Sequence, residues 1–315
     1  RQLSRVCSCF HFSASGLFEM SSSFLQRLRF FHSSDSMPTS NLFVGVAVFF
    51  ILVIAFLVSP WPGGDDWETF RGAAQRVIAG DSLYGTRVTH AYYSNPPWLA
   101  ALLLPLGLMP FKLGWAILSA FSLGAALLLL HRWQPRAGVV KPLLILLSPP
   151  MVYILMHGQI DALLISGVWL PTQYWAIVAL TKPQIAIGLI AGVPRQHWLR
   201  ASILTGLVVG LSLLLWGNWV EELLHQPSPF VSAGHNLWKY LWPYQIPAGV
   251  ALVLLGMSRK DERLLIAGSP LLSPYAATSS LIGPWIAAIT YLSNQQAALV
   301  FLSWWGAVFY RGLVG

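Results

Sequence analysis

The chain has 315 residues, of which 56% are hydrophobic and only 10% are charged, with a mean hydropathy of +0.61. This composition excludes a water-soluble globule and predicts an integral membrane protein. The formal net charge is +8, but the basic residues occur in short clusters between apolar runs. Nucleic-acid binding requires denser basic patches, so we expect no nucleic-acid partner and interpret the positive charge as topology information.

Two parts of unequal character are predicted. Residues 1–36 are rich in Ser and Phe and show no sustained period of 3.6 or 2, so we expect a poorly structured N-terminal extension. Its Arg-rich, acid-poor composition resembles an organellar transit peptide, whereas "MPTSNLFVGVAVFF" from Met37 reads like a natural start, and we favour the second interpretation. Residues 37–315 show no internal repeat and are interpreted as one integral membrane domain.

Apolar segments recur along this domain. The first, 42–58, has the length of about one crossing, and 98–130 is broken by Pro105 and Pro110, which predicts one crossing with a re-entrant piece. The basic linkers "HRWQPR" and "SRKDER" are assigned to the cytoplasm by the positive-inside rule. We therefore expect an all-α polytopic bundle of about nine to eleven transmembrane segments, several too short to span unless they are broken around a wet cavity. The remaining segments are 142–156, 162–170, 174–180, 185–193, 201–216, 248–257, 264–272, 278–292 and 297–310.

A polar island, residues 63–97, separates the first two apolar segments and holds four of the eleven acidic residues. The spacing of Trp67 and Phe70 predicts an amphipathic interfacial helix over 66–78 in the first external loop, ended by Gly80. Asp65 and Asp66 stand at its start, so two carboxylates are expected at the rim of the bilayer. The alternative is that they are an N-cap and a first-turn acid that only stabilise the helix.

Polar residues from distant parts of the chain converge on the external side of this topology. Asp161 and Lys182 are ionisable residues within apolar segments, where each costs about 2.5 to 3.5 kcal/mol at mid-bilayer. We therefore expect them to be paired or to line a wet cavity, and a purely structural pair is the alternative. The full set of external candidates is Asp65, Asp66, His157, Gln159, Asp161, Lys182 and Tyr275.

Three motifs in this order resemble a known family. The island followed by "PPWLAALLLPLGLMP", then "HGQIDALLISG" and "TKPQIAIGLI", is similar to the polyprenyl-phosphate-dependent membrane glycosyltransferases of the GT-C superfamily, and most closely to glycosyltransferase family 87. The resemblance covers about residues 42–200 and implies a multi-pass enzyme that takes a sugar, often mannose, from a lipid-phosphate donor on the outer face. It also implies an acidic base in the first external loop, which maps onto Asp66, with Phe70 as the following aromatic, rather than onto Asp65.

The hypothesis is an inverting hexosyltransferase that acts on a lipid or glycan hydroxyl at the non-cytoplasmic face of a plasma, inner or organellar membrane. Asp66 would be the base, and Asp161 would orient Lys182 or a sugar hydroxyl. Lys182 would hold the leaving phosphate with the help of Arg71, Arg76, His157 or Gln159, although the two arginines are also ordinary headgroup partners.

Two alternatives stay open. The segment "SPYAATSSLIG" lacks the acidic residue that commonly follows "SPY" in the family, which favours a non-catalytic membrane subunit of a larger assembly. A transporter is the other alternative, because broken helices and buried ionisable residues also mark substrate pathways. No cofactor is expected apart from the lipid-linked sugar donor, and the involvement of a divalent metal stays open.

Overall fold

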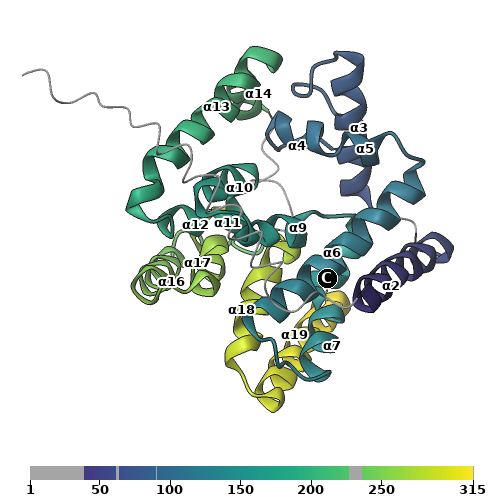
Figure 1. Ribbon diagram of the computed structural model, residues 1–315, viewed down its shortest axis with the longest axis vertical. Helices are drawn as coiled ribbons and strands as arrows, with labels where there is room; N and C mark the ends of the chain where they lie inside the picture. Colours follow the sequence, from purple (N-terminus) through teal and green to yellow (C-terminus); the bar gives the residue numbers. More distant parts are fainter. Residues whose placement is uncertain (1–38, 62–63, 90, 227–235, 315) are drawn as a thin grey trace, which may run out of the picture. The chain divides into compact units, whose positions relative to one another are not determined.

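The computed structural model describes residues 39–61, 64–89, 91–226 and 236–314, and within them every regular element is a helix (Figure 1). The chain divides into two compact units, Arg1–Ile51 and Leu52–Gly315, and α2 (Thr39–Val58) runs across the boundary. The predicted N-terminal extension, residues 1–36, lies outside the described residues.

The second unit is built from helices that are mostly short. The α-helices after α2 are α3 (Asp65–Ala79), α4 (Pro97–Leu102), α5 (Leu104–Gly107), α6 (Phe111–Trp133), α7 (Val140–Leu146), α8 (Pro149–His157), α9 (Asp161–Ile165), α10 (Trp175–Thr181), α11 (Pro183–Ala186), α12 (Gly188–Ala191), α13 (Trp198–Trp216), α14 (Trp219–His225), α16 (Ile246–Arg259), α17 (Glu262–Gly268), α18 (Ile282–Tyr291) and α19 (Asn294–Val314). Short 3-10 turns connect them: η1 (Ser166–Trp169), η2 (Thr172–Tyr174), η3 (Arg195–His197), η4 (Ser269–Leu272) and η5 (Thr278–Leu281).

Candidate membrane spans are fewer than the sequence predicts. Among the described residues, Phe111–Trp133 and Arg195–Trp216 are long and apolar enough to cross a bilayer, and α7 with α8 adds a third if that pair, bent by 46°, is one span. The prolines Pro149 and Pro150 start α8 and explain the bend, because proline cannot continue the preceding helix. A bundle of nine to eleven crossings is therefore not confirmed.

Region 98–130 folds as its prolines indicate. Pro110 precedes α6, which is one long helix, and the residues before it form the short helices α4 and α5. Apolar side chains cover α6 on all sides, and 67% of its most apolar stretch is buried. The helix packs against α8, α9 and α18, so it lies within the core, whereas the equivalent stretch of α13 is only 11% buried.

The predicted amphipathic helix is present as α3, whose position at a membrane interface stays a prediction. Its buried residues are Trp67, Thr69, Phe70, Ala73 and Ala74, which recur at helical spacing on one face. Gly80 follows the helix with φ of 73°, the left-handed conformation typical of a glycine C-cap. The alternative interpretation, in which Asp65 is the N-cap, is wrong in that detail: Gly64 is the N-cap, and the helix begins at Asp65, so both acids lie in the first turn.

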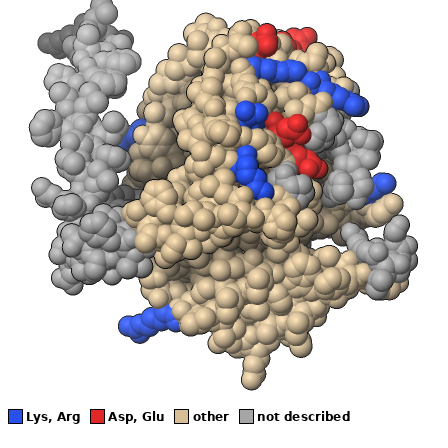
Figure 2. Space-filling model, turned by 90° about the vertical axis from the view of Figure 1, so that its right-hand side faces the viewer, with Lys and Arg blue, Asp and Glu red and all other residues tan. Residues whose placement is uncertain are grey.

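The surface carries its charge unevenly. Figure 2 shows one face on which the visible Asp and Glu side chains and most Lys and Arg side chains gather in the upper part. Below them lies a wide area without charged side chains, with a further basic side chain at its lower left margin. An extended uncharged surface of this kind is expected where a protein contacts lipid or another apolar surface.

Candidate functional site

The start of α3 is held in place by its buried tryptophan. The Trp67 indole N–H donates to the carbonyl of Phe111 at 3.0 Å, and the side chain is fully buried. Gly158 lies directly against it: a Cβ added there would meet the Trp67 Cβ at 2.5 Å, and its φ is +69°. The glycine of "HGQID" is therefore required both by its left-handed backbone and by the close approach of α3.

A continuous chain of hydrogen bonds begins at Asp66. The amide nitrogen of Gln159 donates to Asp66 Oδ2 at 2.5 Å, and the Lys182 ammonium donates to Gln159 Oε1 at 2.6 Å. The same ammonium forms a salt bridge with Asp161 Oδ1. The structure thus brings together four of the predicted residues, from three motifs that are up to 116 positions apart (66 to 182).

Helix breaks place the inner pair. Asp161 is the first residue of α9, after the turn that Gly158 makes at the end of α8. Lys182 separates α10 from α11 in an extended conformation, with φ of −151°, because Pro183 starts the next helix. Both charged side chains therefore project from helix ends, and they are almost completely buried, with 0% of Asp161 and 7% of Lys182 exposed.

The surroundings of this cluster shift the pKa of Asp66. Burial raises the pKa of the Asp66 carboxyl above its usual range, and the positive charge of Lys182 and the hydrogen bond from Gln159 offset only part of this effect. Two carboxyl groups share one ammonium, and Lys182 bonds directly to Asp161. Asp66 is joined to the ammonium through Gln159 instead.

Asp161 retains an unused acceptor. Its Oδ2 atom is buried and has no hydrogen-bond partner among the described residues, although Oδ1 is paired with Lys182. A buried carboxylate oxygen without a partner costs free energy, so a hydroxyl or amine of a bound molecule would stabilise it.

An outer rim of polar groups surrounds Asp66. His157 Nδ1 lies 3.8 Å from Asp65 Oδ2, and 66% of the Asp65 side chain is exposed. Tyr275 is partly buried near the acids, and burial followed by the charges of Asp66 and Asp161 raises its pKa to about 12. Asp65 and His157 are thus near the cluster, but in the described part of the chain no hydrogen bond joins their side chains to its four members. Tyr275 lies within electrostatic reach of Asp66 and Asp161.

Tyr153 was missed by the sequence reasoning. Its ring lies 4.1 Å from the His157 ring, and its phenol is within electrostatic reach of Asp66 and Tyr275. The two rings are four residues apart on α8, a spacing that places side chains on one helix face. That spacing was visible in "YILMH" and could have identified Tyr153.

The two predicted arginines lie elsewhere. Arg71 Nε donates to the carbonyl of Met109 at 3.3 Å. Arg76 donates to the carbonyls of Ser82 and Arg87 and to the Thr86 hydroxyl, and so holds the loop after α3. Arg71 and Arg76 follow Asp66 by five and ten residues, and each residue turns the helix by 100°. Both arginines therefore lie on a different face of α3 from Asp66 and at least one turn further along it. The expectation that they contribute to the same cluster is not supported.

No family model, curated protein or solved structure matches this chain. Within the described residues, no group of three or more His, Cys, Asp and Glu side chains is arranged to hold a metal ion. Function must therefore be inferred from the cluster of Asp66, Gln159, Asp161 and Lys182, hereafter the acid-lysine cluster.

Proposed function

We propose that this protein is a membrane glycosyltransferase that moves a hexose, with mannose as the first candidate, from a polyprenyl-phosphate donor to a hydroxyl of a lipid or glycan. The observation that carries the proposal is the hydrogen-bonded chain from Asp66 through Gln159 to Lys182 and Asp161. It combines an acid that can exchange a proton with a buried cation, and both are needed for this transfer.

In the proposed reaction, Asp66 accepts the proton of the acceptor hydroxyl. The hydroxyl oxygen forms a bond to the sugar C1 as the bond from C1 to the phosphate oxygen breaks, so the configuration at C1 inverts. The polyprenyl phosphate leaves with the bonding electrons. The raised pKa of Asp66 supports this role, because a general base is most effective when its pKa approaches the working pH.

Lys182 would stabilise the negative charge that develops on the leaving phosphate. Its salt bridge to Asp161 holds the ammonium in position before the donor binds, which reduces reorganisation during the reaction. The unpartnered Oδ2 of Asp161 is available to accept a hydrogen bond from a sugar hydroxyl. The rim residues His157 and Tyr275 would contact the same ligand.

The proposed setting is a multi-pass bundle with the acid-lysine cluster on the non-cytoplasmic side. The two or three candidate spans support a membrane location, and α16 and the described part of α2 add shorter apolar helices. The full count of nine to eleven crossings belongs to this proposal, together with lipid and the lipid-linked donor as partners.

The test uses the full chain in lipid nanodiscs with radiolabelled polyprenyl-phosphate mannose and a set of glycan and lipid acceptors. Asp66→Asn is expected to lower kcat by about 10² to 10⁴-fold, the usual effect of losing a general base. Asp65→Asn is the matched control, because the Asp65 carboxylate is next to Asp66 in the chain but is exposed and forms no hydrogen bond with the acid-lysine cluster. Equal activity of Asp66→Asn and wild type would refute the assignment.

A second candidate, a transporter, is favoured by one observation. Asp161 and Lys182 both lie at breaks between short helices, an arrangement that transporters use at substrate sites. Solute flux into proteoliposomes that depends on Asp161, without sugar transfer, would select this function. A stoichiometric complex with other subunits and no turnover would instead select the non-catalytic role.

A further inference from the structure

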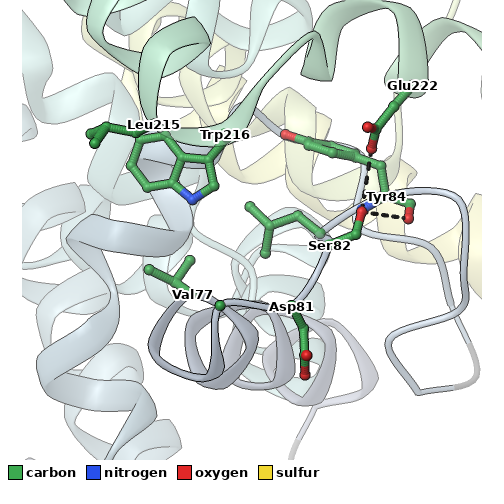
Figure 3. Close-up of a pocket in the computed structure, with 9 residues that line it drawn as sticks. Val77, Asp81, Ser82, Tyr84, Leu215, Trp216 and Glu222 are labelled. Carbon is green, nitrogen blue, oxygen red and sulfur yellow. Dashed lines mark hydrogen bonds between the residues drawn. The ribbon is translucent and has the colours of Figure 1, made fainter.

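A polar cavity lies at the opposite end of α3 from Asp66. It has a volume of about 290 Å³ and is formed where the end of α3 and the following turn face the junction of α13 and α14 (Figure 3). Gly80, in its wall, is roughly 20 Å along the helix axis from Asp66, at 1.5 Å per residue. The cavity is therefore separate from the acid-lysine cluster, although α3 connects the two.

Aromatic packing holds the walls of this cavity together. Trp219, at the start of α14, stacks on Tyr84 with ring centroids 6.3 Å apart and 24° between the planes. Its indole N–H donates to the Ser212 hydroxyl of α13 at 2.9 Å, and the Tyr84 hydroxyl donates to the carbonyl of Asn95 at 2.7 Å. The polar island and the α13–α14 junction are thus joined, so the cavity is preformed.

The lining combines an apolar side with a hydrogen-bonding side. Val77, Leu83 and the indole of Trp216 supply apolar surface. Across from Trp216, the Ser82 hydroxyl donates to Glu222 Oε2 at 3.3 Å (Figure 3). More than a third of the Glu222 surface is exposed, so its carboxylate can accept further hydrogen bonds from a ligand.

The charge of the lining selects among ligands. Two carboxylates, those of Asp81 and Glu222, border the cavity, and among the described residues no Lys or Arg lines it, so this lining disfavours a phosphate group. The Asp81 carboxylate points away from the cavity in Figure 3, which leaves one carboxylate facing a ligand. A neutral sugar ring matches this lining, because its hydroxyls donate to a carboxylate while its C–H face packs on an indole.

We propose that this cavity is an acceptor subsite that binds one neutral sugar ring, stacked on Trp216 and hydrogen-bonded to Glu222. This inference rests on the proposed transferase function. The volume is close to the lower limit of about 300 Å³ for ligand pockets, which suits a single ring and excludes the much larger lipid-linked donor. The distance from Asp66 means that the bound ring is remote from the reacting hydroxyl of an extended acceptor.

The first experiment measures sugar binding without any turnover. Saturation-transfer NMR of methyl α-mannopyranoside with the full chain in detergent micelles gives a Kd for wild type and for each variant. Glu222→Gln and Trp216→Ala are each expected to raise Kd about tenfold, the loss of one charged hydrogen bond or one stacking surface. Glu221→Gln is the matched control, because this neighbouring acid does not line the cavity and should leave Kd unchanged.

Several outcomes would overturn the inference. The mannoside could give no saturation-transfer signal, or its Kd could be equal in wild type and all variants. Tetramethylammonium could also bind in a way that depends on Glu222 while the mannoside does not bind. Glu222→Gln replaces an exposed side chain and keeps a hydrogen-bond acceptor for Ser82, so this variant should fold. The test therefore still works if the larger change, Trp216→Ala, prevents folding.

The second experiment links the cavity to transfer. In the nanodisc assay, Glu222→Gln should raise the KM of a glycan acceptor about tenfold and leave the KM of the donor and kcat unchanged. Cavity-dependent mannoside binding by a chain without turnover would contradict the proposed transferase, and with it the acceptor role, while the sugar site itself would stand. Turnover with an acceptor KM that is insensitive to Glu222 would contradict the acceptor subsite alone.

Discussion

Replacement of Lys182 by Met tests the physical account of the acid-lysine cluster through stability. Met keeps the length of the side chain and removes the ammonium, so Asp161 loses its salt bridge and Gln159 loses a donor. A carboxylate that is 0% exposed cannot stay ionised without a partner, so it takes up a proton instead. At pH 7, about 3 pH units above the usual pKa of aspartate, adding this proton costs about 4 kcal/mol of free energy.

We therefore expect Lys182→Met to lower the free energy of unfolding by about 3 to 4 kcal/mol at pH 7, in the range known for breaking buried ion pairs. The loss should shrink to about 1.5 kcal/mol at pH 5, because protonating the remaining acid costs less there. The double variant Asp161→Asn with Lys182→Met removes both charges and should regain at least about 2 kcal/mol.

The measurement is reversible unfolding by denaturant in detergent micelles, followed by tryptophan fluorescence at pH 5 and pH 7. A loss below about 1 kcal/mol, a loss that does not depend on pH, or a double variant no more stable than the single one would each refute this reasoning.

Two other predictions concern Gly158 and Asp66. Gly158→Ala should lower the free energy of unfolding by about 1 to 3 kcal/mol in thermal unfolding, because the new methyl group meets Trp67 and the backbone is left-handed. The control is Gly124→Ala in α6, where nothing lies within 4 Å of an added Cβ, and this change should be neutral or stabilising by up to about 1 kcal/mol. The acid limb of kcat/KM should have its midpoint above the usual aspartate range, because the base must lose its proton and the Asp66 pKa is raised. Gln159→Leu removes a hydrogen bond that lowers this pKa, so the midpoint should move to higher pH, and a fixed midpoint in the pH profile would exclude Asp66 as the titrating group.

Local patterns were sufficient for the surface helix. The spacing of Trp67 and Phe70, the acids before them and Gly80 after them are all contained within sixteen residues, and α3 forms with those bounds to within one residue. The proline positions likewise predicted the short pieces before α6. Features of this kind depend on neighbours in the chain, so sequence reasoning reaches them.

The number of membrane crossings was harder to predict. Hydropathy identifies apolar segments, but an apolar segment can be a lipid-facing span or part of a buried core, and these differ only in what surrounds them. In α13 most of the surface is exposed, whereas α9, α10, α11 and α12 are short helices around the core that no single straight span describes.

The residue types at the cluster followed from the sequence, since Asp161 and Lys182 in apolar surroundings were expected either to pair or to line a wet cavity. Their union with Asp66 through Gln159 required the fold, because these contacts join residues far apart in the chain and depend on the approach of α3 to Gly158. The same reason explains the cavity beside Trp216, which forms where the end of α3 faces the junction of α13 and α14. Composition and local spacing specify which polar and charged side chains need a hydrogen-bond or salt-bridge partner. Which residue is that partner depends on which helices pack together.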